Sequence, residues 1–244
     1  VGIALLMAYE QVLEQLRTKH PRQERIAVSL LDTLSLLAAS GVPTHWLLRI
    51  DGDSDAVRDT LSFLKSATIF QESSDGNKTI IHWLQGHVYR ETYLNDQKKL
   101  GEARRCAATL LGGSDIDRLE NGEQRRDETH HLIEQFLSVT SQDYSHSLFS
   151  EPRVSSKLAE TLHDATSLGM SQLALGLTDS VTQACDVLGP HHPDTLASRN
   201  NLAGTYRASG RLDKAIALYE QNLEDSIRVL GTDHPGTLTS RLNL

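Results

Sequence analysis

The stretch VLGPHHPDTLASRNNL, residues 187–202, decides the fold, because it returns as VLGTDHPGTLTSRLNL, residues 229–244. The spacing of 42 residues is constant from Val187 to Leu202, so no insertion separates the two copies. A fixed period of this length is typical of proteins built from stacked structural repeats. We therefore expect the C-terminal part of the chain, residues 153–244, to be a repeat region.

Two helical patterns lie between the copies. The first begins at Pro193, which suits an opening helical turn because its missing N–H would have had no intrahelical partner. It ends before Gly210, which can take the left-handed cap conformation. The second covers residues 211–230, with apolar residues at helical spacing, and ends at Gly231. Each repeat is therefore predicted to be a helix-turn-helix.

A diverged copy precedes the full one. Leu158-Ala159 resembles Leu202-Ala203 at an offset of 44 residues, and Gly169 resembles Gly210 at an offset of 41. Since the two offsets differ, this copy is not in strict register with the full one. The repeat region then holds a diverged copy at 155–189, a full copy at 192–231 and a truncated copy at 234–244.

The full copy carries a spaced signature of large and small residues. Ala203 and Ala215 would let the two helices approach closely, while Tyr206 and Tyr219 would fill the space between them. This signature resembles that of the tetratricopeptide family, and the period of 42 residues resembles the longer kinesin-light-chain type. The residues that carry the resemblance are Leu202, Ala203, Tyr206, Gly210, Ala215 and Tyr219.

One face of the first helix of the full copy is the candidate binding site. Its residues recur at three- and four-residue steps, and they avoid the face that bears Leu202, Ala203 and Tyr206. The family resemblance implies that this face lines a concave groove, with Asn201 placed to hold a ligand backbone. Alternatively, the asparagines are kept only because the period is kept. The predicted groove residues are Ala197, Asn200, Asn201, Gly204, Arg207 and Asn243.

Residues 1–95 form a different kind of module. Their apolar spacing and turn signals predict three main helices, then a β-hairpin, then another helix. Helices are expected over 1–19 and 23–39, through Trp46 and after Asp53, with strands at 68–70 and 79–81 and a last helix near His82.

This order, and the sequence of residues 1–95, resembles the winged-helix segment of NB-ARC (STAND) signalling ATPases, many of which continue into tetratricopeptide arms. In that family a Met-His-Asp motif opens the helix after the wing, and its histidine approaches the phosphates of the nucleotide. The matching positions here are Ile81, His82 and Trp83, so the histidine is kept and the acid is replaced. The resemblance implies that His82 would contact a nucleotide only together with a nucleotide-binding core.

The expected fold is therefore mainly α: a winged-helix-like module with a small β-hairpin at 1–95, a helical connector at 96–152, and an α-solenoid of tetratricopeptide helical hairpins at 153–244. The chain lacks an initial Met and stops inside a helical pattern, so we expect a fragment of a longer protein. The unfinished last copy would favour self-association through the truncated C-terminal repeat.

No catalytic constellation is apparent in the sequence. The GxxxxGK[ST] phosphate loop is absent, so we expect no enzyme activity and no cofactor in this chain, with ATP or ADP bound only by the full-length protein. The pairs His130-His131 and His191-His192 are adjacent rather than at zinc-ligand spacing, so no metal site is expected. Two cysteines without CxxC spacing are typical of reduced thiols in a cytoplasmic protein.

Charge and hydropathy restrict the partners. The net charge is −8, and the helix before the hairpin holds Asp53, Asp55 and Asp59, which argues against binding nucleic acid. The apolar opening Val1 to Met7 is too short to cross a membrane. The expected partner is a protein or peptide segment in the repeat groove.

We interpret the chain as the protein-interaction and regulatory arm of a STAND-type ATPase whose nucleotide-binding core lies outside it. One alternative is a freestanding tetratricopeptide scaffold or adaptor. A second alternative is a transcriptional regulator whose winged helix reads DNA.

Overall fold

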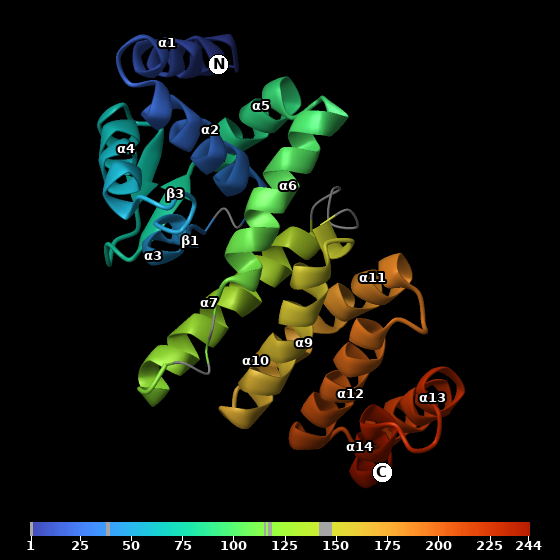
Figure 1. Ribbon diagram of the computed structural model, residues 1–244. Coiled ribbons are helices and arrows are strands. Elements are labelled where there is room, and N and C mark those ends of the chain that lie inside the picture. The colour runs from blue at the N-terminus through green and yellow to red at the C-terminus, as the bar shows by residue number, and fades with distance from the viewer. Residues whose placement is uncertain (1, 38–39, 115, 117–118, 142–147) are drawn as a thin grey trace. The chain divides into compact units, whose positions relative to one another are not determined.

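The computed structural model describes residues 2–37, 40–114, 116, 119–141 and 148–244. These residues are mainly helical and include a small antiparallel sheet, as predicted (Figure 1). The chain divides into two compact units, Val1–Ser114 and Asp115–Leu244. This division falls inside the connector expected at 96–152.

Two helices of the first unit begin at or within two residues of their expected starts. His20 has a non-helical backbone, so the second helix begins at Pro21, two residues before the expected start. Asp53 caps the fourth helix, where its carboxylate accepts a hydrogen bond from the backbone N–H of Ala56 at 3.1 Å. The helices are α1 (Gly2–Lys19), α2 (Pro21–Leu36), α3 (Thr44–Leu47), α4 (Ser54–Ser66), α5 (Trp83–Tyr93) and α6 (Gln97–Gly112).

The sheet has one strand more than the sequence predicted. Strands β2 (Phe70–Glu72) and β3 (Lys78–Ile81) form the expected antiparallel hairpin, while β1 (Val42–Pro43) pairs with the other edge of β3. A two-residue strand has no alternation by which a sequence could reveal it. Gly41 makes the pairing possible, because its φ is +106° and a Cβ there would lie 2.8 Å from Ile80 Cγ1.

Helix α2 is the centre of the first unit. It packs against α1, α4, α5 and α6, and its Leu30, Leu31 and Leu34 are at most 1% exposed. Burial of a leucine side chain stabilises a fold by about 1.5–3 kcal/mol, so this helix supplies much of the core. Trp46 of α3 is fully buried as well.

In the second unit, helices pack on their neighbours along the chain and on helices further along it. Helix α9 contacts α7 and α12, and α13 contacts α12 and α14 (Figure 1). Residues 142–147, within the connector expected at 96–152, lie outside the described residues. The helices are α7 (Gly122–Thr140), α9 (Pro152–Ser167), α10 (Ser171–Ala174), the 3₁₀ turn η2 (Leu175–Leu177), α11 (Thr178–Leu188), α12 (Pro193–Ala208), α13 (Leu212–Leu230) and α14 (Pro235–Asn243).

The helix ends fix the register of the diverged copy. Helices α9 and α12 both begin with proline and have 16 residues, so their offset is 41 (193 − 152). The expected pairing of Gly169 with Gly210 has this same offset, and both glycines have a positive φ, +74° and +76°. The expected pairing of Leu158-Ala159 with Leu202-Ala203 at 44 is wrong, because Thr161 and Leu162 occupy those positions.

The joint between consecutive copies is built in the same way twice. It starts at a glycine of positive φ, Gly189 (+85°) and Gly231 (+91°). The hydroxyls of Thr195 and Thr237 donate back to the carbonyls of these glycines at 2.9 and 2.7 Å. In both joints the histidine before the proline accepts a backbone N–H through Nδ1 and so caps the new helix.

The second helix of each copy differs. In the full copy, α13 is continuous, whereas in the diverged copy the 3₁₀ turn η2 separates α10 from α11. Gly176 lies in this turn, and a Cβ there would be 3.3 Å from Leu137 Cδ2 of α7. The break therefore coincides with a close approach to α7.

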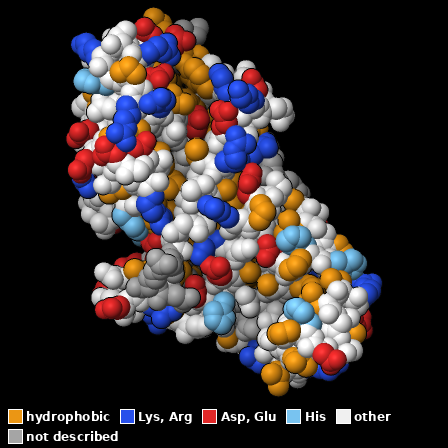
Figure 2. Space-filling view, viewed as in Figure 1, with side chains coloured by type: hydrophobic (Ala, Val, Ile, Leu, Met, Phe, Trp, Pro, Cys, Tyr) orange, Lys and Arg blue, Asp and Glu red, His pale blue; other side chains and the backbone are white. Residues whose placement is uncertain are grey.

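The core of the full copy confirms the predicted packing of large on small residues. Ala203, Ala215 and Tyr219 are at most 3% exposed, and Tyr206 packs against them. Figure 2 shows hydrophobic side chains gathered on the surface over α13 and α14. Leu242 of α14 is 86% exposed.

Candidate functional site

A groove of about 350 Å³ lies between α9 and α12, and Ile116 also lines it. Two of the predicted groove residues, Ala197 and Asn201, line it from α12. The opposite wall is one face of α9, whose lining residues recur at three- and four-residue steps. The polar and small residues of the groove include Ser156, Lys157, Ala159, Glu160, His163 and Asp164 from α9, and Asp194, Ala197 and Asn201 from α12.

Asn201 is half-buried and joins the two walls. Its Nδ2 donates to the carbonyl oxygen of Ala159 at 2.7 Å, so the side chain fixes the spacing of α9 and α12. A side-chain amide has two donor hydrogens and an acceptor oxygen, so this bond uses only part of its capacity. The described residues supply no partner for Oδ1, which leaves an acceptor available to a ligand.

Asn200 and Asn243 form a similar contact between α12 and α14. The Nδ2 of Asn243 donates to the Oδ1 of Asn200 at 3.0 Å and ties α14 to α12. Asn201 and Asn243, which are 42 residues apart, thus each bond to the opening helix of the preceding copy. Sequence reasoning missed this packing role, because it depends on which side chain of the preceding helix is opposite.

The structure places Gly204 and Arg207 away from the groove and beside their own copy. A Cβ on Gly204 would lie 3.4 Å from the Tyr219 hydroxyl oxygen of α13. The guanidinium carbon of Arg207 is 5.9 Å from the centre of the same ring, within cation–π distance. Of the six predicted residues, Ala197 and Asn201 line this groove, Asn200 and Asn243 bond to each other between α12 and α14, and Gly204 and Arg207 lie beside Tyr219.

The electrostatic character of the groove comes from residues that were not predicted. Lys157 is paired with Glu160, one helical turn further along α9. Asp194 accepts a hydrogen bond from the Ser156 hydroxyl at 3.2 Å, which joins the walls a second time. At the observed offset of 41, Glu160 of α9 occupies the position that Asn201 occupies in α12. An alignment of the two helices at this offset would therefore have identified Glu160 as a groove residue.

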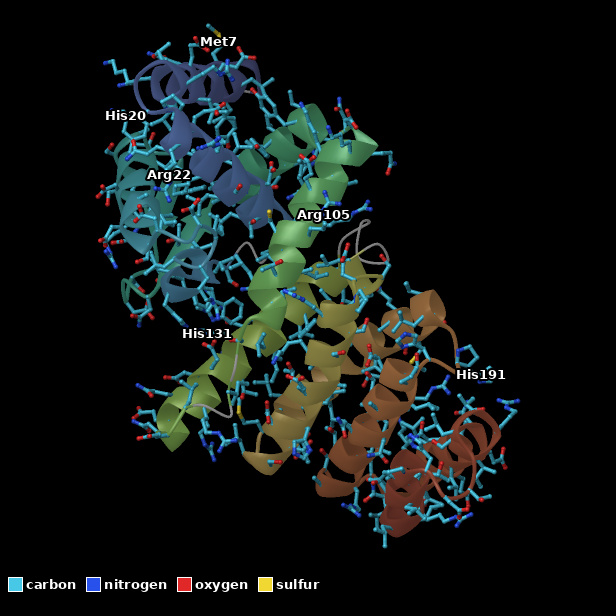
Figure 3. The ribbon with its side chains drawn as sticks, in the orientation of Figure 1. Met7, His20, Arg22, Arg105, His131 and His191 are labelled. Atoms are coloured by element: carbon cyan, nitrogen blue, oxygen red, sulfur yellow. The ribbon has the colours of Figure 1, made fainter. Side chains whose placement is uncertain are left out.

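A separate ion network holds the two helices of the full copy together. Asp225 of α13 is 7% exposed and pairs with Arg199 of α12 at 2.8 Å and with Arg228 of its own helix. Arg228 Nη2 also lies 3.4 Å from Nδ1 of His191, in the loop before α12 (Figure 3). These charges satisfy one another, so we assign them to packing rather than to binding.

In the first unit, His82 is exposed at the N-terminus of α5. Its Nδ1 accepts a hydrogen bond from the backbone N–H of Leu84 at 3.3 Å, so the imidazole caps the helix. The neighbouring Trp83 is 63% exposed. A histidine fixed in this way presents Nε2 beside the positive end of a helix, an arrangement suited to an anion.

One partly buried carboxyl group of the first unit has a strongly raised pKa. Asp32 of α2 accepts a hydrogen bond from the Tyr89 hydroxyl at 2.8 Å. Burial raises the pKa of Asp32 from the ordinary 3.8 to about 6, and the Tyr89 hydrogen bond opposes this shift. Tyr89 in turn packs edge-on against Tyr9, with ring centres 5.7 Å apart. The sequence did not predict this cluster, because its three residues lie far apart along the chain and form no local pattern.

The described part of the chain offers neither a metal site nor a membrane-spanning helix. It contains no group of three or more His, Cys, Asp or Glu side chains that could hold a metal ion. No helix among residues 2–37, 40–114, 119–141 and 148–244 is long and apolar enough to span a bilayer.

Comparison with known proteins identifies the repeat. Residues 195–236 match the family model described as tetratricopeptide repeat. The Arabidopsis thaliana protein named kinesin light chain-related 2 is 69% identical over 32 residues, which cover 13% of this chain and 5% of that protein. No solved structure matches the chain. The chain thus carries a tetratricopeptide repeat, as predicted, and the matched family is typically a non-catalytic interaction module.

Proposed function

We propose that the second unit binds an extended segment of a partner protein in the groove between α9 and α12. The observation that carries this function is the groove itself, which the opening helices of two consecutive tetratricopeptide-type copies enclose. Its volume of about 350 Å³ lies within the range of ligand-binding pockets. It is large enough for a few side chains of such a segment.

The hydrogen bonds across the groove support this function. Asn201 and Ser156 each connect the two helices, so the walls are held at a fixed distance before a ligand arrives. Binding to a site that is already ordered avoids much of the entropic cost of association. The Oδ1 of Asn201 would accept a backbone N–H of the bound segment, as the family resemblance implies.

We also propose that the chain is the regulatory arm of a STAND-type ATPase. The first unit supports this, because its helices precede a hairpin and a further helix in the order of a winged helix. His82 is exposed and fixed at the N-terminus of α5, where a nucleotide phosphate could approach. In the full-length protein, His82→Ala should weaken ADP binding measured by calorimetry. Full-length protein that binds no nucleotide would instead favour a freestanding scaffold.

The DNA-reading alternative receives less support from the first unit. Arg22 (labelled in Figure 3) pairs with Asp51 at 2.6 Å and with Asp53 at 3.0 Å, and Arg58 of α4 pairs with Asp55. These arginines are therefore committed to carboxylates beside and within α4. A helix whose cations are neutralised in this way attracts DNA phosphates weakly.

A selection from a displayed library of short peptides tests the binding function. Ala197 is exposed and lines the groove, so Ala197→Trp should fill it without disturbing the core. Ala208, also exposed on α12 but outside the groove, gives the matched control Ala208→Trp. Selected peptides should bind the wild type and the control but not Ala197→Trp. Peptides that bind all three equally would place the binding surface elsewhere.

A further inference from the structure

The groove between α9 and α12 has acids on both walls. Glu160 projects from α9 and Asp194 from α12, and Asp164 adds a third carboxylate on the α9 side. The one lysine or arginine among the described lining residues is Lys157. The net charge of these three acids and Lys157 is therefore negative. It stays negative when only one of the two α9 acids is included in the sum.

The lysine does not offer its charge to a ligand. Its side chain is 10% exposed and its ammonium group pairs with Glu160. Glu160 itself is 57% exposed, so its carboxylate remains accessible to solvent on the side away from Lys157. The pair as a whole carries no net charge, but its lysine lies inside and its carboxylate faces solvent, and Asp194 adds a further carboxylate at the rim.

The apolar lining of the groove consists of Ala159 of α9, Ala197 of α12 and Ile116. The two alanines leave space along the helices that larger side chains would fill. Lysine and arginine side chains pair an apolar stem with a charged head, and they bury the stem while the head meets carboxylates or water. The combination of this apolar lining and an acidic rim fits such a side chain.

We propose that the groove selects a basic segment of its partner, with a lysine or arginine side chain lying over Ala159 and Ala197 and its head between Glu160 and Asp194. This inference rests on the proposed binding function and names the class of partner. Charge-assisted hydrogen bonds to the two carboxylates would hold the cation. The Asn201 Oδ1 would accept a backbone N–H of the same segment.

Three pools of fluorescent peptides of equal length test the inference: one enriched in Lys and Arg, one in Glu and Asp, and one neutral. Anisotropy titrations should show that the basic pool binds the wild type and that Ala197→Trp abolishes this binding. The variant Glu160→Gln/Asp194→Asn removes both rim charges and keeps a hydrogen-bond acceptor for Ser156. It should weaken the basic pool roughly tenfold or more.

A matched variant controls for the overall charge of the protein. Asp213→Asn/Glu220→Gln removes two exposed charges from α13, outside the groove, and should leave binding of the basic pool unchanged. Equal weakening by both double variants would show unspecific attraction and overturn the inference. Circular dichroism of both variants checks that the helices remain folded.

The outcomes separate this inference from the function on which it rests. If the acidic or neutral pool binds best and Ala197→Trp blocks it, the groove is a binding site and the proposed basic partner is wrong. If Ala197→Trp blocks none of the pools, the binding function fails as well.

Discussion

Replacing Asp32 by asparagine should remove a large part of the pH dependence of the stability of the first unit. The folded state raises the pKa of Asp32 from 3.8 to about 6, so it holds the proton more tightly than the unfolded chain does. The stabilisation from this group is fully present below about pH 3.8 and is lost as the pH rises through about 6. A difference of about two pKa units corresponds to about 3 kcal/mol.

The asparagine variant keeps the geometry and removes the titration. Its Oδ1 can still accept the hydrogen bond that the Tyr89 hydroxyl donates at 2.8 Å. Between about pH 4 and about pH 7.5, the wild type should lose about 3 kcal/mol of unfolding free energy relative to Asp32→Asn. The charged neighbours Glu102 and Lys99 act on Asp32 in opposite directions, so neither alone determines the result.

Tryptophan fluorescence isolates the first unit, because both tryptophans of the chain, Trp46 and Trp83, belong to it. Urea titrations at a series of pH values then give the unfolding free energy of that unit. Asp59→Asn, at an exposed position of α4, is the control and should follow the wild-type profile. Parallel profiles for the wild type and Asp32→Asn would refute the reasoning.

Three further predictions concern the packing. Gly41→Ala should cost the first unit at least about 1–2 kcal/mol in the same titrations, because of the positive φ and the contact with Ile80; unchanged stability would mean that β1 does not need the glycine. Asn201→Ala should destabilise the second unit by about 1 kcal/mol, because the hydrogen bond to the Ala159 carbonyl is lost. Hydrogen exchange should show faster exchange of the backbone amides in α9 and α12 but not in α7. Leu242→Gln should reduce any concentration-dependent self-association seen by sedimentation, since this leucine is 86% exposed; the same association in both proteins would exclude this face.

The sequence predicted the elements that local signals define. Asp53 and Gly210 each mark a helix boundary through the backbone of a few residues, and the structure confirms both boundaries. Matching by side-chain type was less reliable, since the Leu158-Ala159 pair suggested an offset of 44 where the helix ends give 41. Apolar pairs recur many times along a helical chain, whereas the proline that starts the first helix of a copy and the glycine after that helix each occur once in a copy.

The sequence predicted a binding groove on one face of α12 but not the residues that lie opposite that face. Ala197 and Asn201 were identified because they lie on one helix, where spacing determines the face. Glu160 was missed because its position opposite Asn201 depends on the register between two helices. The bond between Asp32 and Tyr89 spans 57 residues, and no local pattern reports such a contact.

The joint between copies has a consequence for how such a chain can change over time. Its parts, the glycine of positive φ, the capping histidine before proline and the threonine that bonds back to the glycine carbonyl, all lie within one short run such as Gly189–Thr195. A duplicated gene segment that carries this run brings a complete connection with it. Insertion or deletion of whole copies then leaves the neighbouring joints chemically intact, so the length of the array can evolve without compensating substitutions elsewhere.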